Sequence, residues 1–174
     1  MCKCKSGIAV RLDETTIRVY QLDGEDSHNT IRQMHGLTDS AFPLGRYQTP
    51  IELVPVRGLA IGDCDFVFDA GRPDWWTDDM TRQATTSLYP DIARLATGEP
   101  YGGDLYLHNL TSLPEGASLS AGGHLDLGSL TSLPDGASLS AGGYLDLGSL
   151  TSLPEDFDRS CIVGTVYLAN RGNA

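Results

Sequence analysis

Leucines recur at a fixed interval through the second half of the chain. Residues 110–129 read LTSLPEGASLSAGGHLDLGS, and residues 130–149 repeat them with changes at only two positions, Glu115/Asp135 and His124/Tyr144. Within each copy, Leu-Asp-Leu alternates apolar and polar residues, which in a strand directs both leucines to one face and the aspartate to the other. A strict period of this length is typical of a solenoid in which each copy forms one coil.

One coil of 20 residues cannot bury its leucines alone, whereas coils stacked at strand spacing bury them against one another. We expect the Gly-Gly pairs to form corners that need unusual backbone angles. The pattern predicts a parallel β-solenoid of about three to four coils over residues 99–174. In its degenerate last coil, which acts as a cap, Val166 and Leu168 replace the leucine pair one residue late.

The first half of the chain has no such period, and its apolar residues predict short separate elements. Alternation and β-branched residues predict strands at 7–12, 16–22, 51–57 and 65–69, the first two forming a β-hairpin. Pro55 would confine the third strand to a sheet edge or a bulge. A short helix is expected over 27–34, with Asp26 or Ser27 as its N-cap.

A longer helical pattern follows, with Thr77 as the expected N-cap and apolar residues every fourth position from Trp76 to Leu88. Pro90 is expected to end this helix and to open a second short one, which Gly98 stops. We therefore predict an α+β part over residues 1–98, consisting of a small β-sheet plus short helices. Its helical segment 77–97 would cap the solenoid.

The net charge of the chain restricts the classes of partner that it can bind. The 174 residues carry 12 Lys and Arg against 23 Asp and Glu, a net charge of −11, which opposes binding to a phosphate backbone. We expect no direct nucleic-acid binding, and either a solvated acidic surface or a partner protein with a basic surface. The longest apolar runs are too short for a membrane span or a signal peptide, so a cytoplasmic location is expected.

The cysteines and histidines predict no cofactor. Cys2, Cys4, Cys64 and Cys161 form no disulfide framework, and the four histidines show no pair at metal-ligand spacing. Metal binding by Cys2 and Cys4 would need further ligands, and the same terminus is a possible contact in a homodimer.

Six aspartates crowd the middle of the chain and give the enzymatic alternative, a small metal-dependent hydrolase. Their spacing matches no calcium loop, and helix capping with strand-end solvation explains them more simply. We assign no catalytic residue and expect a protein that is not an enzyme. The six are Asp63, Asp65, Asp69, Asp74, Asp78 and Asp79.

Two columns of the predicted solenoid point away from the leucines. If Leu125 faces inward, its neighbours face outward, and tyrosines on a rigid face supply contact area at low entropic cost. Trp75 is a further candidate contact, because adjacent tryptophans cannot share one helical stripe and Trp76 fits the core. A solvated sheet face is the simpler alternative to a protein-binding strip. The strip residues are Asp104, Tyr106, His124, Asp126, Tyr144, Asp146 and Tyr167.

The LTSLP element resembles short bacterial leucine-rich repeats over residues 105–154. That resemblance implies a binding surface without catalysis. LDLGSLTSLP lacks the asparagine of the LxLxxNxL core, so both a horseshoe and a flatter β-helix-like coil stay open.

DFVFDAGRPDWWTDDMTRQA, residues 65–84, is similar to segments of bacteriophage and prophage proteins. This similarity implies a phage source, and small acidic phage proteins often inhibit host machinery. We expect a non-enzymatic, acidic inhibitor of a host defence or nucleic-acid-processing protein, of the anti-CRISPR or DNA-mimic kind. A structural protein that assembles through the solenoid is the remaining alternative.

Overall fold

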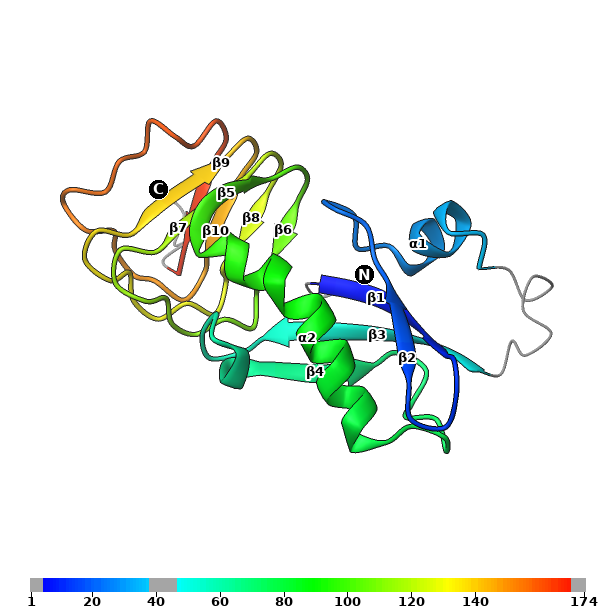
Figure 1. The fold of residues 1–174 in the computed structure, drawn as a ribbon. Coiled ribbons are helices and arrows are strands. Elements are labelled where there is room, and N and C mark those ends of the chain that lie inside the picture. The colour runs from blue at the N-terminus through cyan, green and yellow to red at the C-terminus, as the bar shows by residue number, and fades with distance from the viewer. Residues whose placement is uncertain (1–4, 38–46, 170–174) are drawn as a thin grey trace. The chain divides into compact units, whose positions relative to one another are not determined.

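The computed structural model describes residues 5–37 and 47–169, so Cys2 and Cys4 lie outside the described residues. The chain divides into two compact units. The first comprises Met1–Val54 and Asp65–Asp91, and the second comprises Pro55–Cys64 and Ile92–Ala174. A small sheet with two helices forms the first part of the fold, and a parallel β-solenoid of about four turns follows over residues 97–168 (Figure 1).

The sheet of the first unit has four strands in the order β2-β1-β3-β4: Ile17–Tyr20, Lys5–Arg11, Gln48–Pro55 and Cys64–Phe68. β1 and β2 form the predicted antiparallel hairpin, whose turn is held by Asp13 Oδ1 accepting the N–H groups of Thr15 and Thr16 at 2.8 Å. The expectation that Pro55 makes β3 an edge strand is wrong. β3 lies inside the sheet, and Pro55 is its last residue, beyond the final pair Lys5–Leu53.

Successive residues of β1 alternate between two covered faces. Ile8 and Val10 pack with Ile31 of α1 (His28–Met34) and with Leu37. Gly7 faces the other way, where a Cβ would lie 3.1 Å from Leu88 Cδ2 of α2 (Asp78–Leu95). The predicted N-cap of α1 is confirmed, because Ser27 Oγ accepts the N–H of Thr30 at 3.3 Å.

α2 is one helix of 18 residues with Pro90 inside it, so the expected break into two helices is wrong. Proline inside a helix costs about 3 kcal/mol. Met80, Ala84, Leu88 and Ile92 are each 0% exposed. Their continuous four-residue stripe holds the helix together across the proline because burying such side chains contributes about 1.5–3 kcal/mol each for the larger ones. Of the helices in the described parts, none is long and apolar enough to cross a bilayer.

Two parallel sheets build the solenoid. One has three strands, β5-β7-β9: Thr97–Tyr101, Ser118–Ala121 and Ser138–Ala141. The other has four, β11-β10-β8-β6: Val166–Leu168, Leu145–Leu147, Leu125–Asp126 and Leu105–Tyr106. Neighbouring strands pair 20 residues apart except at the start of β5, where Thr97 pairs with Ser118 before the register shifts. The last pair, Leu145–Val166, has the extra residue that the sequence predicts. The strand β5 lies before the first Gly-Gly pair and was not predicted, because it carries no leucine.

Inward leucines fill the solenoid as expected, with Leu105, Leu125 and Leu145 at most 2% exposed. The Gly-Gly pairs do form corners, but the expected reason is wrong, since among the described residues none of these glycines has a positive φ. A Cβ on Gly142 would overlap the carbonyl oxygen of Gly122 in the preceding coil. Glycine is therefore required for close approach between coils. The left-handed conformation occurs instead at Gly116 and Gly136, with φ of 67° and 71°.

The loop after β3 extends the solenoid at its first coil. It contains a short 3-10 helix, Ile61–Asp63, and belongs to the second unit. The Arg57 carbonyl accepts the backbone N–H of Ser112 at 3.1 Å and its hydroxyl at 2.5 Å. One coil later, the Thr111 carbonyl accepts in a similar way from the N–H of Thr131 at 3.3 Å. The loop thus occupies the place of an earlier coil.

Candidate functional site

The predicted outward residues come together on one face of the four-stranded sheet. Register pairs place Tyr106 beside Asp126, Asp126 beside Asp146, and Asp146 beside Tyr167. Tyr106, Asp126, Asp146 and Tyr167 form the strand column, and the residues at the Gly-Gly corner before each strand, Asp104, His124 and Tyr144, form the corner column. We call the whole set the acidic–aromatic strip, and its side chains are half-buried except for Asp104, which is exposed. The strip consists of Asp104, Tyr106, His124, Asp126, Tyr144, Asp146 and Tyr167.

The corner column is joined by side chains that accept hydrogen bonds from the next coil. Asp104 Oδ1 accepts the N–H of His124 at 2.8 Å, and His124 Nδ1 accepts the N–H of Tyr144 at 3.0 Å. The His124 and Tyr144 rings also stack, with centroids 3.8 Å apart and planes at 18°. Because Nδ1 is an acceptor, the proton of the neutral His124 ring is on Nε2. These residues therefore stabilise the stack as well as forming its outer face.

The strand column holds like charges side by side. Asp126 and Asp146 each accept the N–H of the residue two positions later, at 3.0 and 2.8 Å, which fixes their carboxylates at the turn that follows the strand. Strand spacing is about 4.8 Å, and two unit charges at that distance repel by about 1 kcal/mol in water. Like charges directly beside each other destabilise a sheet. The strip is thus a concentrated negative surface held at some energetic cost.

The pKa values within the strip reflect these contacts. The backbone N–H of His124 holds the pKa of Asp104 below its ordinary value, and the Tyr106 hydroxyl adds to that effect through a 3.2 Å hydrogen bond. Burial raises the pKa of Tyr106 and of Tyr144, and the neighbouring carboxylates raise both further. At neutral pH the ionised Asp104 therefore lies beside the neutral phenols of Tyr106 and Tyr144, which can donate hydrogen bonds.

Trp75 lies in the first unit, apart in the chain from the strip. Its ring lies 6.4 Å from that of Tyr47 and 5.6 Å from that of Trp76, and the Arg11 guanidinium is 5.8 Å from its centre. Trp76 is 4% exposed, which confirms its prediction as a core residue. The Trp-Trp pair is thus one core ring and one half-buried ring that lies tilted against it.

The six aspartates of the enzymatic alternative have different partners. Asp63 lies in the second unit and pairs with Arg57 at 3.4 Å. Asp78, in the first turn of α2, pairs with Arg72 at 2.9 Å, and Asp79 pairs with Arg82. Asp65 and Asp74 are exposed. Asp69 lies close to two other side chains of types that can bind metal ions.

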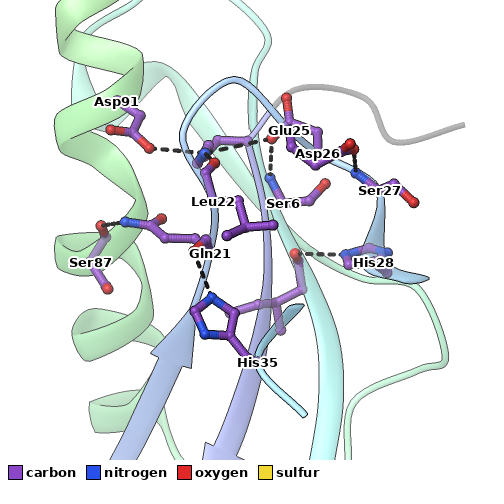
Figure 2. Close-up of polar contacts among 12 residues, drawn as sticks. Ser6, Gln21, Leu22, Glu25, Asp26, Ser27, His28, His35, Ser87 and Asp91 are labelled. Carbon is purple, nitrogen blue, oxygen red and sulfur yellow. Dashed lines mark hydrogen bonds and ion pairs between the residues drawn. The ribbon is translucent and has the colours of Figure 1, made fainter. Parts of the chain in front are cut away.

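Asp69 lies with His28 and Glu52, and ligand atoms of these three side chains are within 4.8 Å of one another. His28 Nδ1 is 3.0 Å from Asp69 Oδ2. Its Nε2 is 3.2 Å from the carbonyl oxygen of Ile51, and Figure 2 shows this hydrogen bond of His28 as a dashed line. Sequence analysis missed this group. The residues stand 24 and 17 positions apart, in α1, in β3 and just after β4, so the fold and not their spacing brings them together.

A hollow of about 200 Å³ lies beside the last two coils, lined among others by Leu133, Leu139, Phe157 and Cys161. Sites for drug-sized ligands usually measure about 300–1,000 Å³. This hollow is too small for such a ligand.

Comparison of the chain with known protein families, with characterised proteins and with solved structures finds no match. The resemblance of residues 105–154 to leucine-rich repeats therefore depends on the LTSLP pattern alone. Function has to be argued from the geometry of the chain itself.

Proposed function

We propose that the chain is a protein-binding module that presents the acidic–aromatic strip to a basic surface of another protein. The observation that carries the proposal is the row of carboxylates in register, Asp126 beside Asp146, flanked by Tyr106 and Tyr167. A cationic partner would relieve the mutual repulsion of the carboxylates, which supplies a driving force for binding. Tyrosines held on a sheet add contact area with little loss of entropy.

Charge along the solenoid supports the same partner class. Between residues 97 and 169 the sequence has eight acidic residues besides Glu99 and a single basic residue, Arg159. Such a field speeds the encounter with a basic protein and repels nucleic acid. A bound solenoid would block whatever the basic surface otherwise binds. We therefore favour inhibition of a host defence or nucleic-acid-processing protein, in line with the phage-protein resemblance of residues 65–84.

The test compares two double variants with equal charge changes. Asp126→Asn with Asp146→Asn removes charge from the strip, while the amide oxygen still accepts the corner N–H group. Glu115→Gln with Asp135→Asn removes the same charge from exposed turns elsewhere in the same coils. Each protein is immobilised and incubated with bacterial lysate at about 50 and about 300 mM salt, since salt screens exposed charges.

At low salt, we expect the wild type and the variant with the turn substitutions to retain a basic protein that the variant with the strip substitutions does not retain. At high salt, none of the three should retain it. Its affinity for the strip variant should fall at least about tenfold, equivalent to about 1.4 kcal/mol. Equal retention by all three proteins, or retention of no protein by a well-folded wild type, would contradict the proposal. Circular dichroism of each variant checks that the solenoid is intact.

A further inference from the structure

The first unit contains a group of side chains that the strip does not involve. His28 is the first residue of α1, Glu52 is in β3, and Asp69 directly follows β4. The Asp69 backbone N–H donates to the carbonyl of Pro50 at 3.4 Å, which positions Asp69 beside β3. The His28 side chain is 11% exposed and that of Asp69 is 42% exposed, whereas Glu52 is 2% exposed. The group is therefore deep at Glu52 and open to solvent at Asp69.

The orientation of the His28 ring is informative. Its Nε2 is 3.2 Å from the Ile51 carbonyl oxygen, an acceptor, so Nε2 carries a proton. The other nitrogen, Nδ1, then faces the Asp69 carboxylate at 3.0 Å. Metal-ligating histidines commonly donate their second N–H to a backbone carbonyl in this way, which fixes the ring and directs the lone pair at the ion.

A second observation comes from Ser6 on the neighbouring strand. Ser6 is paired with Glu52 in the β1–β3 register, so both side chains are on the same face of the sheet. The Ser6 hydroxyl is fully buried and has no hydrogen-bond partner. Buried hydroxyls are rarely left in this state. A carboxylate held by a cation, or water bound to that cation, would supply the missing acceptor.

We propose that His28, Glu52 and Asp69 bind one divalent transition-metal ion through an imidazole nitrogen and two carboxylate oxygens. The 3.0 Å between Nδ1 and Oδ2 fits two ligands bound about 2.0–2.2 Å from one ion. A mixed nitrogen and oxygen set suits Zn²⁺ or Mn²⁺ better than Mg²⁺, which prefers oxygen and retains its waters. Three protein ligands leave coordination positions open on the Asp69 side. The alternative is an imidazolium ion held between Asp69 and the Ile51 carbonyl, with no metal.

The experiment uses the full chain with Cys2→Ser and Cys4→Ser, so that thiols at the terminus do not bind the probe. Calorimetry measures Zn²⁺ and Mn²⁺ binding after chelator treatment, and thermal melting is followed with and without each ion. His28→Gln is compared with His35→Gln. His35 is a matched control because its Nε2 also lies near a backbone carbonyl, that of Gln21 at 3.0 Å (Figure 2).

We expect one Zn²⁺ per chain, weaker binding of Mn²⁺, and a higher melting temperature in Zn²⁺. His28→Gln and Asp69→Asn should each lower the Zn²⁺ affinity by more than the roughly 10- to 100-fold that loss of an outer-shell partner costs. His35→Gln should bind as the parent does. Ser6→Ala should lower the affinity about tenfold without lowering the melting temperature of the metal-free protein.

The absence of Zn²⁺ and Mn²⁺ binding by the folded parent would overturn the proposal and leave the imidazolium pair. Binding that survives both His28→Gln and Asp69→Asn would overturn it as well, by locating the ion elsewhere. If either variant fails to fold, the Zn²⁺ affinity of the Ser6→Ala protein and the Co²⁺ spectrum of the parent test whether the ion binds at this group. The spectrum should contain ligand-field bands and no thiolate-to-cobalt charge-transfer band, which a cysteine site would give.

Discussion

Alanine at Gly142 provides a direct test of how the coils stack, because the same corner occurs three times in different surroundings. A Cβ on Gly142 would overlap the Gly122 carbonyl oxygen, and one on Gly122 would meet the Gly102 carbonyl oxygen at 3.0 Å. A Cβ on Gly102 would meet nothing within 4 Å. We therefore expect stability to fall in the order Gly102→Ala, Gly122→Ala, Gly142→Ala.

The size of the change in unfolding free energy follows from the hydrogen bonds and the packing that a Cβ would disturb at this corner. Two hydrogen bonds cross between coils here, Gly142 N–H to Ala121 at 3.0 Å and Gly143 N–H to Gly123 at 2.8 Å. Weakening both costs about 1–3 kcal/mol, and overpacking costs about 1–3 kcal/mol. Alanine restricts the unfolded chain, which returns about 0.4–1 kcal/mol. Gly142→Ala should lose about 3 kcal/mol of unfolding free energy, whereas Gly102→Ala should gain about 0.4–1 kcal/mol.

Urea unfolding followed by far-UV circular dichroism measures these free energies. Both tryptophans, Trp75 and Trp76, are in the first unit, so tryptophan fluorescence reports on that unit separately. The loss in Gly142→Ala should appear in the circular dichroism signal. Equal stability of Gly142→Ala and Gly102→Ala would refute the role that we assign to close approach at the Gly-Gly corners.

Five further substitutions, at four positions, probe the interior and the corner column of the solenoid. Leu127→Ala, at a fully buried position, should destabilise by about 2–5 kcal/mol, and Leu133→Ala, at a half-buried one, should cost clearly less in the same urea assay. His124→Asp should keep the bond to the Tyr144 N–H, as Asp104 does one coil earlier. His124→Phe keeps only the stacking and should lose about 0.5–1.5 kcal/mol, so equal stability of the two would count against the hydrogen bond. The pKa of Asp104 is below its ordinary 3.8, so its stabilising effect is complete above that pH and is lost as pH falls through the folded-state pKa. Asp104→Asn should accordingly flatten the fall in stability between about pH 5 and about pH 2.5, and an unchanged slope would contradict the assignment.

The solenoid could be predicted from the sequence because its signal is local and repeated. Leu125 and Leu127 recur in register every 20 residues, and identical coils can stack in only one register that buries both. The degenerate coil at Val166 was predictable for the same reason. The continuity of α2 could not be predicted in this way. The general rule for proline gives the energetic cost at Pro90, but it leaves out the buried stripe on both sides, whose stabilisation exceeds that cost.

The missed features depend on residues far apart in the chain. The loop 55–64 continues the solenoid through the Arg57 carbonyl, a backbone group that any sequence possesses. His28, Glu52 and Asp69 have no characteristic spacing, and the β1–β3 register places only Ser6 and Glu52 together. Sequence reasoning found the strip because both of its columns repeat. It did not find that Asp104 and His124 also hold the next coil.

The two near-identical copies are not interchangeable, and the corner column explains why. Of their two differences, Glu115/Asp135 is in exposed turns, whereas His124/Tyr144 decides whether a coil can accept an N–H group from its successor. Asp and His can do so through a ring or carboxylate atom close to the backbone, and the distant phenol oxygen of Tyr cannot. The copy with His124 thus holds its successor through a side chain at the corner, whereas the coil after Tyr144 is joined to it by the parallel pairing of β10 with β11. Duplication of the His copy would therefore lengthen the stack by whole coils and repeat this corner hydrogen bond in each of them.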